Sequence, residues 1–329
     1  MSIRFALLGA GRIGRVHAQT LASNSQAQLI AVADFSATTA QQLIADFGGQ
    51  VRSIEAIAAA DDIDAVLICT PTNTHADLIE KFARAGKAIF CEKPIDLSSE
   101  RVKACLKVVE STNTQLMVGF NRRFDPHFAA LKQVIDSGQI GEVEMINIIS
   151  RDPGVPPIDY VKVSGGIFKD MTIHDFDMAR YLLSEEISTV MASASVLIDP
   201  AMEAAGDFDS ANIILTTASG KQCAISNSRR AAYGYDQRIE VHGSLGMVSA
   251  DNLREANIEV ATANGYTKPP LHDFFMTRYT AAYAAEIEAF ITALSTESKL
   301  EPSGTDGLQA LAIAEAAMAS VTQGQAIQL

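Results

Sequence analysis

The chain has 329 residues, 48% of them hydrophobic, and a formal net charge of -13 at pH 7. This length suffices for two domains with a large core, and the negative charge, which no Lys/Arg-rich run offsets, argues against nucleic acid as the main partner. No apolar run approaches the length needed to span a bilayer, so we expect no membrane insertion.

The N-terminus and the cysteine content indicate a protein of a reducing compartment. A strand-like segment begins almost at the first residue, so the sequence predicts no signal peptide. The four cysteines form no CxxC pair and predict no zinc site; two of them, Cys69 and Cys91, end apolar runs where a small buried thiol is expected. We therefore expect a cytoplasmic location.

The first 34 residues have the spacing of a dinucleotide site. The apolar run 3–8 leads into Gly9-Ala10-Gly11-Arg12-Ile13-Gly14, and a second apolar run, 28–33, ends on Asp34, 20 positions after the last glycine. The first glycine permits the tight turn, the second lets the backbone approach a pyrophosphate, and the third lets helix and strand pack closely. The following helix N-terminus offers free N–H groups to phosphates.

Asp34 predicts a preference for NAD over NADP. A carboxylate at the end of the second strand can accept hydrogen bonds from both adenosine ribose hydroxyls, whereas a 2′-phosphate would place negative charge beside it. At about 4 Å and an effective dielectric near 20, each pair of unit charges costs roughly 4 kcal/mol. The alternative interpretation is an aspartate that only starts a turn.

Apolar runs of strand length alternate with helical patterns through the first 120 residues. Such βαβ alternation predicts a parallel sheet with helices on both faces, an N-terminal Rossmann domain over residues 1–120. The predicted strands are 3–8, 28–33, 63–69, 88–91 and 115–120, and the predicted helices include 12–22, 74–85 and 98–111.

The second part of the chain, 121–329, has a different pattern. Neighbouring strand-like runs with short turns predict an α/β domain with a large, mostly antiparallel sheet. A helix near Gly166 interrupts the runs. The predicted strands are 143–150, 187–198, 211–217, 222–227, 238–241 and 247–250, and helices are predicted at 125–137, 273–294 and 304–322.

The tetrapeptide Cys91-Glu92-Lys93-Pro94 follows a predicted buried strand. Because ligands of open parallel sheets bind at the carboxyl ends of the strands, Lys93 is expected to project into the cofactor crevice. The alternative is a solvated loop lysine.

The segment 165–174 holds Asp170 and His174, which are four residues apart and share one face of a helix. An imidazole with an ordinary pKa of about 6.5 is a suitable proton acceptor at neutral pH, and a carboxylate one turn away can orient it. A metal site and a helix with a mixed polar face are the alternatives.

Two further segments, 119–126 and 233–236, carry potential hydrogen-bond donors. The first lies at the expected domain junction, where pockets form. Arg122, Arg123 and Tyr235 could bind hydroxyl groups, although arginines at a surface or interface are the simpler interpretation.

Together these segments resemble the Gfo/Idh/MocA family of oxidoreductases over nearly the whole chain. The resemblance implies a Rossmann domain followed by an α/β domain whose open sheet pairs subunits into homodimers or homotetramers. The residues that carry it are the glycine loop, Asp34, Cys69-Thr70-Pro71-Thr72-Asn73-Thr74-His75, Glu92-Lys93-Pro94, Gly119-Phe120-Asn121-Arg122-Arg123-Phe124-Asp125 and Gly165-Gly166 through His174-Asp175-Phe176-Asp177.

The activity implied by the resemblance is oxidation of one secondary hydroxyl of a polyol, with hydride passing to NAD. The last two segments and Tyr233-Gly234-Tyr235-Asp236 are most similar to inositol-oxidising members, which implies oxidation of myo-inositol to its 2-keto product in inositol catabolism. By the same resemblance the catalytic residues are Lys93, Asp170 and His174. The implied cofactor contacts are Gly9, Gly11, Arg12, Ile13, Asp34, Thr70, Pro71, Asn73, His75, Glu92 and Lys93, and the implied substrate contacts are Lys93, Asn121, Arg122, Asp152, Asp170, His174 and Tyr235.

Two departures from the family pattern bear on which polyol is bound. Ser150-Arg151-Asp152-Pro153 lies where some relatives place a His and an Asn, and Asn121 takes a place where Met occurs elsewhere. Alternatives are therefore scyllo-inositol or an aldose as substrate, an NAD-dependent glycosidase, or a non-catalytic dinucleotide sensor.

The expected mechanism uses no metal. His174 takes the hydroxyl proton, Lys93 donates a hydrogen bond to the developing alkoxide, and Asp170 orients both groups.

Overall fold

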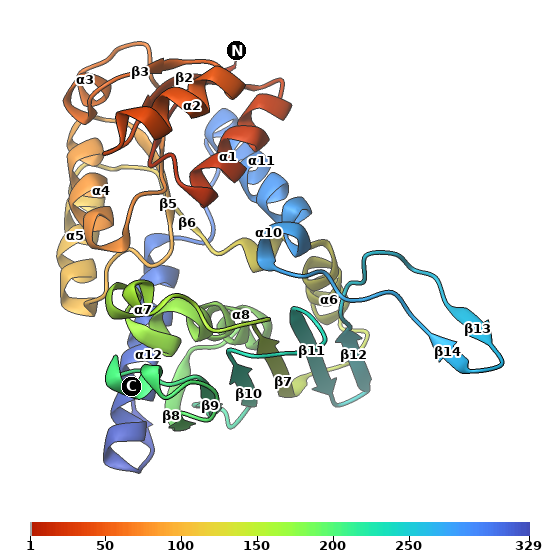
Figure 1. The fold of residues 1–329 in the computed structure, drawn as a ribbon. Helices are drawn as coiled ribbons and strands as arrows, with labels where there is room; N and C mark the ends of the chain where they lie inside the picture. Colours follow the sequence, from red (N-terminus) through yellow and green to blue (C-terminus); the bar gives the residue numbers. More distant parts are fainter. Residues whose placement is uncertain (1) are drawn as a thin grey trace. The chain divides into compact units, whose positions relative to one another are not determined.

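The computed structural model describes residues 2–329, which divide into two units (Figure 1). Unit 1 contains the chain up to Phe124 together with Ala281–Leu311, and unit 2 contains Asp125–Thr280 and Ala312–Leu329. The expected domain boundary at residue 120 thus lies four residues before Phe124, where the chain first passes from unit 1 to unit 2. The segment 281–311, which the sequence analysis assigned to the second domain, belongs to unit 1.

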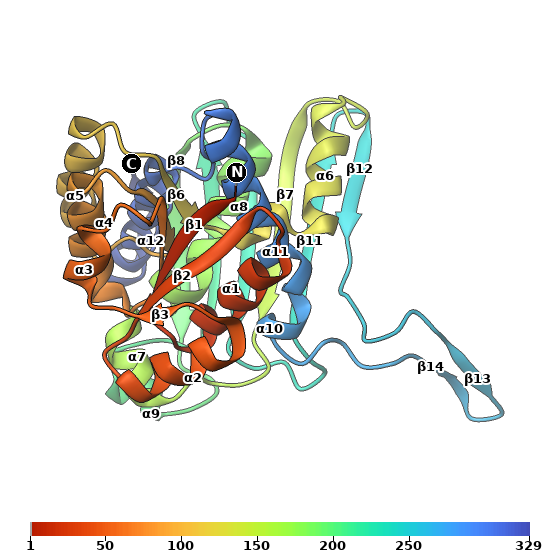
Figure 2. The same cartoon turned by 90° about the horizontal axis from the view of Figure 1, so that it is seen from above.

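Unit 1 is built on a six-stranded parallel sheet of order β3-β2-β1-β4-β5-β6, the order of a Rossmann sheet. The two helix pairs α1–α2 and α4–α5 cover its two faces (Figure 2). The strands are β1 Ile3–Leu8, β2 Ala27–Ala33, β3 Gln50–Val51, β4 Ala65–Ile68, β5 Ala88–Glu92 and β6 Leu116–Gly119; the helices are α1 Arg12–Ser23, α2 Ala37–Phe47, α3 Ile54–Ala58, α4 His75–Arg84, α5 Ser99–Ser111, α11 Thr280–Thr296 and the short η1 Thr72–Thr74 and η2 Asn121–Phe124.

Helix α11 joins unit 1 because its apolar face completes the core of the parallel sheet. Ile287, Phe290 and Ile291 are fully buried in one cluster with residues of β1 and β5. The ring of Phe290 lies 6.2 Å from that of Phe5 and 5.9 Å from that of Phe90. Burial of three large apolar side chains contributes several kcal/mol, which explains why the chain returns to this unit.

Unit 2 is built on a seven-stranded sheet of order β12-β11-β7-β10-β9-β8-β15, antiparallel except for the β10–β7 pair. The predicted α/β class, with one parallel and one mostly antiparallel sheet, is confirmed. The strands are β7 Val143–Arg151, β8 Ile187–Ser195, β9 Ser210–Thr217, β10 Gln222–Ser228, β11 Asp236–Gly243, β12 Gly246–Ala250 and β15 Ile327–Gln328; the helices are α6 Pro126–Asp136, α7 Ile158–Ser164, η3 Phe168–Thr172, α8 Ile173–Leu183, α9 Ala201–Ala204, α10 Phe275–Arg278 and α12 Gly304–Gln323, whose first turns belong to unit 1.

The unit 2 sheet has one covered and one open face. Helices α6 and α8 pack on the covered face, while Met145, Met191, Ile214 and Met247 of the open face are 42–50% exposed. A hairpin of β13 Val260–Thr262 and β14 Gly265–Thr267 projects from this unit in both views (Figures 1 and 2). Among residues 2–329, no helix combines the length and apolar character required to cross a membrane.

Candidate active site

The glycine loop between β1 and α1 has the shape that dinucleotide binding requires. Gly9 has φ +96°, and a Cβ there would lie 2.5 Å from the carbonyl oxygen of Cys69. A Cβ on Gly14 would lie 1.9 Å from the carbonyl oxygen of Gly9, whereas one on Gly11 would meet no atom within 4 Å. The first and third glycines therefore permit close packing, and the second leaves open space for a ligand.

The N-terminus of α1 has free hydrogen-bonding capacity at this loop. No side chain caps it, and its first turn holds no acidic residue. Unpaired N–H groups and the positive end of the helix dipole are suited to a pyrophosphate. Arg12 and Ile13, two of the expected cofactor contacts, begin this helix.

Asp34 follows β2 and is fastened to the glycine loop. One oxygen of its carboxylate accepts the N–H of Ala10 at 2.6 Å, and the other accepts the N–H of Ser36 at 2.7 Å. These bonds fix the carboxylate beside the loop, with further lone pairs available to ribose hydroxyls.

The loop after β4 holds Thr70, Pro71, Asn73 and His75. The His75 side chain is buried, and its ring nitrogens lie 2.7 Å from the carbonyl oxygen of Thr70 and 2.8 Å from that of Pro94. Burial lowers the pKa of His75. This ring therefore ties the loop after β4 to the loop after β5, a role that sequence reasoning did not give it.

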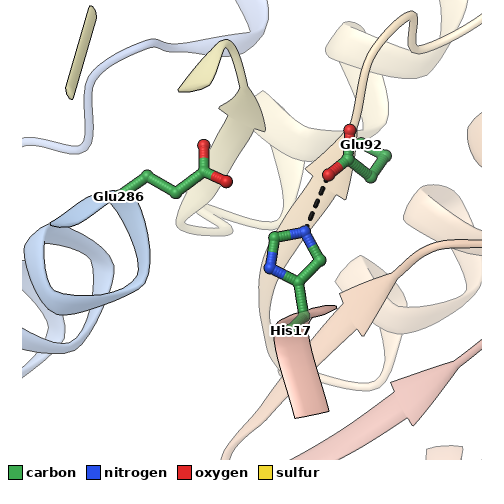
Figure 3. Close-up of side chains that lie close together, drawn as sticks. All are labelled: His17, Glu92 and Glu286. Carbon is green, nitrogen blue, oxygen red and sulfur yellow. Dashed lines mark hydrogen bonds and ion pairs between the residues drawn. The ribbon is translucent and has the colours of Figure 1, made fainter. Parts of the chain in front are cut away.

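Glu92, at the end of β5, forms a buried cluster with His17 of α1 and Glu286 of α11 (Figure 3). His17 Nε2 lies 2.7 Å from Glu92 Oε1, and potential ligand atoms of all three side chains lie within 4.8 Å of one another. The His17 ring also packs edge-on against Phe90 and Tyr283 at 5.2 and 5.8 Å.

Glu286 is fully buried, points toward the His17–Glu92 pair, and has no hydrogen-bond partner for either oxygen among the described residues. Burial and the charge of Glu92 raise the pKa of Glu286 well above its usual value of 4.5. In a tetrahedral metal site with bonds of about 2.0–2.1 Å, ligand atoms lie about 3.3 Å apart. The shorter His17–Glu92 contact favours a shared proton over a shared metal ion.

Sequence reasoning did not identify His17 or Glu286. The available signal was a histidine on the buried face of α1, where Gly14, Ala18 and Leu21 also lie. Its partner is 75 residues away in the chain, a pairing that local patterns do not reveal.

The expected cofactor residues of unit 1 line one edge of its sheet. Gly9, Asp34, Thr70 and Lys93 follow the carboxyl ends of β1, β2, β4 and β5, which are adjacent in the order β2-β1-β4-β5. Ligands of open α/β sheets bind at this edge. The geometry therefore supports a nucleotide site here, with partly exposed Lys93 at its β5 end.

In unit 2, Asp170 and His174 lie on a π-helical turn and the α-helix that continues it. Gly165 and Gly166 precede the turn with φ +85° and +79°, and a Cβ on Gly166 would lie 2.6 Å from Asp207 Oδ1. Phe168–Thr172 then forms η3, and Ile173 begins α8. Such π-helical turns occur frequently at functional sites. Asp170 and His174 are partly exposed on elements that are otherwise largely buried.

A buried polar network anchors the start of α8 to the sheet. The carboxylate of Asp175 accepts hydrogen bonds from Ser150 Oγ at 2.6 Å and from Asn227 Nδ2 at 2.8 Å. Thr172 Oγ1 donates to Asn227 Oδ1 at 2.6 Å. The hydrogen bonds of Thr172 and Asp175 therefore fix the backbone on either side of His174.

The expected substrate contacts are distributed over the two units. Asn121 and Arg122 are buried in η2 of unit 1, while Asp152 and Tyr235 belong to unit 2. The Tyr235 ring is 6% exposed and packs against Phe274 and Tyr279.

Arg123 is engaged within unit 1, where it forms an ion pair with Asp306 at 3.0 Å. The structure thus gives Arg123 a structural role.

Comparison with known proteins identifies both parts of the chain. Residues 3–120 match the oxidoreductase family with an NAD-binding Rossmann fold, and residues 128–249 match the GFO/IDH/MocA C-terminal domain. An inositol 2-dehydrogenase of Rhizobium meliloti strain 1021 is 65% identical over 329 residues, all of both chains.

Solved structures give the same result. The crystal structure of a putative myo-inositol dehydrogenase from Sinorhizobium meliloti 1021 is 65% identical, with a TM-score of 0.98 over 99% of each chain. A scyllo-inositol dehydrogenase from Lactobacillus casei, solved with NAD(H) and scyllo-inositol, is 28% identical, with a TM-score of 0.93 over 100% of this chain and 99% of that chain.

Proposed function

The chain belongs to the GFO/IDH/MocA family of oxidoreductases, and on that basis we propose that it is an NAD-dependent inositol 2-dehydrogenase. The reaction is oxidation of the 2-hydroxyl of myo-inositol to the ketone. The observation that carries the proposal is the 65% identity, over the whole of both chains, to a protein of that name.

The residues of unit 1 fit the cofactor. Open space at Gly11, the uncapped N-terminus of α1 and the fixed carboxylate of Asp34 match a pyrophosphate and an adenosine ribose with a free 2′-hydroxyl. When bound, NAD accepts the hydride that leaves the substrate carbon.

Three side chains move or hold the proton in this proposal. Neutral His174 takes the proton of the reacting hydroxyl, and Lys93 donates a hydrogen bond to the oxygen as negative charge develops on it. Asp170 orients Lys93 and His174 and compensates the charge of Lys93 and the charge that His174 gains with the proton. The proposal requires Lys93 of unit 1 and His174 of unit 2 to meet at one hydroxyl group.

The remaining substrate hydroxyls are assigned to Asn121, Arg122, Asp152 and Tyr235. These side chains can donate hydrogen bonds to the hydroxyls of a neutral polyol or accept them. Because one solved relative contains scyllo-inositol, that isomer is the second candidate substrate.

The open face of the unit 2 sheet supports assembly into homodimers or homotetramers. Its exposed methionines and Ile214 form an apolar surface of the kind that subunit contacts cover. The four cysteines are all buried as free thiols, in keeping with a cytoplasmic enzyme of inositol catabolism.

A spectrophotometric screen tests the proposal. Purified protein is mixed with NAD and each of a panel of inositol isomers and common aldoses, and NADH formation is followed. We expect the highest kcat/KM with myo-inositol, stoichiometric use of NAD, and a preference for NAD over NADP of two to three orders of magnitude, roughly 3–4 kcal/mol. NAD binding without turnover of any polyol would contradict the proposal, as would a need for NAD in catalytic amounts only.

A further inference from the structure

Arg229 is a buried arginine between two carboxylates of unit 2. It directly follows β10 and is 1% exposed. Its Nη1 and Nη2 lie 3.4 and 3.5 Å from Asp170 Oδ2, and Nη2 lies 3.7 Å from Asp207 Oδ2. The Arg229 N–H donates to the carbonyl oxygen of Asp209 at 2.8 Å, which fixes the base of the side chain.

Asp207 connects this arginine to the backbone that carries Asp170. Asp207 Oδ1 accepts the N–H of Ile167 at 2.9 Å and lies where a side chain on Gly166 would be. The guanidinium of Arg229 therefore links two carboxylates. One belongs to Asp207, which fixes the start of the π-helical turn, and the other to Asp170 in the middle of that turn.

The charges in this cluster are unequal. Two carboxylates, 15% and 4% exposed, share one guanidinium, which does not lose its proton. The contacts of 3.4–3.7 Å exceed the 2.7–2.9 Å of strong charge-assisted hydrogen bonds. Arg229 therefore acts on Asp170 chiefly through its charge, whose effect extends beyond hydrogen-bond range.

We propose that Arg229 is a positioning residue for the oxidation, because its guanidinium, which lies between Asp170 and Asp207, holds the Asp170 carboxylate in the orientation that serves His174. The inference rests on the roles that the proposed function gives to Asp170 and His174. It adds a residue that acts through Asp170.

Several other groups face Asp170 and set its environment. Tyr160 of α7 donates a hydrogen bond to Asp170 Oδ1 at 2.8 Å. His174 follows on α8, and the adjacent Lys169 lies 3.7 Å from Glu315 of α12. With these groups unchanged, loss of the Arg229 charge leaves uncompensated negative charge beside His174.

The pH profile of inositol oxidation measures this effect. In Arg229→Gln we expect the acid limb of kcat/KM to move upward by about one pH unit, since the uncompensated negative charge beside His174 favours the protonated ring, which cannot accept the substrate proton. At neutral pH kcat falls about tenfold while KM changes little. Because Arg229→Lys keeps the positive charge, we expect the acid limb of its kcat/KM profile to lie close to the wild-type position.

Arg230→Gln is the matched control. Arg230 is the next residue, is exposed, and its replacement changes the net charge equally. We expect its pH profile to match that of the wild type. Circular dichroism and NAD affinity show that each variant is folded.

Asp207→Asn tests the same cluster should Arg229→Gln fail to fold. Asparagine still accepts the Ile167 N–H but leaves the guanidinium to Asp170 alone, so the acid limb moves to lower pH. A folded Arg229→Gln variant with the wild-type limb, or an unshifted Asp207→Asn profile, overturns the inference.

Asp170→Asn separates this inference from the proposed function. If Asp170→Asn loses activity while Arg229→Gln keeps the wild-type profile, only the role of Arg229 fails. If Asp170→Asn retains full activity, the proposed catalytic assembly itself fails, and the role of Arg229 fails with it.

Discussion

The two units each bury a pair of carboxylates near a predicted functional lysine or histidine, and they compensate those charges differently. In unit 1, Glu92 and Glu286 adjoin His17, and burial raises the pKa of Glu286 well above its usual value. In unit 2, Asp170 and Asp207 share the permanent charge of Arg229. The net charge of the cluster in unit 1 therefore changes with pH. The charge balance of the cluster in unit 2 depends instead on one residue, Arg229.

The two units also differ in the contacts that hold the backbone of their predicted functional segments. The nucleotide edge of unit 1 is shaped by close backbone contacts at Gly9 and Gly14, which no side chain can replace. The π-helical turn of unit 2 is shaped by side-chain contacts to Asp207 and Asp175. Backbone changes should therefore disrupt unit 1, and charge changes should disrupt unit 2.

The largest effect is expected from Gly14→Ala. Its Cβ would lie 1.9 Å from the Gly9 carbonyl oxygen, so α1 and the loop cannot keep their positions. We expect a loss of more than about 4 kcal/mol, seen as aggregation or a greatly lowered Tm.

Gly11→Ala is the control for this prediction, because a Cβ there meets no atom within 4 Å. This variant should fold normally and bind NAD at least about tenfold more weakly by calorimetry. A Gly14→Ala protein of wild-type stability would contradict the account of the loop.

Lys93→Ala and His174→Ala remove one functional group from each unit. Loss of a preorganised group that acts on the developing alkoxide typically costs about 3–4 kcal/mol, or a hundred- to thousandfold in kcat. NAD affinity should persist in both variants, as measured by fluorescence titration. Turnover within tenfold of wild type in either variant would exclude that residue from the mechanism.

Replacement of one ionisable side chain in each cluster by glutamine compares the two clusters directly. Arg229→Gln leaves the buried Asp207 and the partly exposed Asp170 without their cation and should cost about 3–5 kcal/mol in the free energy of unfolding at neutral pH. Glu286→Gln has the shape of the protonated acid and removes an ionisable group whose pKa is raised, so it should not lower the free energy of unfolding. Urea unfolding measures both, and equal losses would refute the distinction between the clusters.

Glu286 also makes the stability of the protein depend on pH. Because its pKa is raised in the folded state, the folded protein binds more protons than the unfolded chain above the usual value of 4.5. Its contribution is fully present below that value and is lost as pH rises toward the folded pKa, by about 1.4 kcal/mol per unit.

Glu286→Gln should show a flatter stability profile between about pH 5 and pH 8 than the wild type. Glu288→Gln on the same helix, where Glu288 is exposed, is the control and should keep the wild-type slope. Identical slopes for wild type and Glu286→Gln would show that Glu286 is ionised in the folded protein.

The sequence predicts the elements whose cause is local. Glycine spacing and apolar runs predict the glycine turn, the position of Asp34 and five of the six parallel strands, because steric limits and periodicity act within a few residues. The short edge strand β3 and the two-residue β15 escaped prediction because they hold too few residues to show a period.

Long-range pairings could not be predicted in this way. The apolar period of α11 is visible in the sequence, but nothing local assigns Phe290 to the core of unit 1. The partners of Asp170 illustrate the same limit, since Arg229 is 59 residues away. Charge compensation in buried clusters is decided by tertiary packing, which a single sequence does not encode in local patterns.

A crystal structure of the ternary complex with NAD and myo-inositol tests the central claim most directly. The account predicts that Lys93 Nζ and a ring nitrogen of His174 both lie within hydrogen-bond distance of the 2-hydroxyl, whose carbon faces the nicotinamide C4. Either side chain turned away from that hydroxyl in the closed complex would contradict the account.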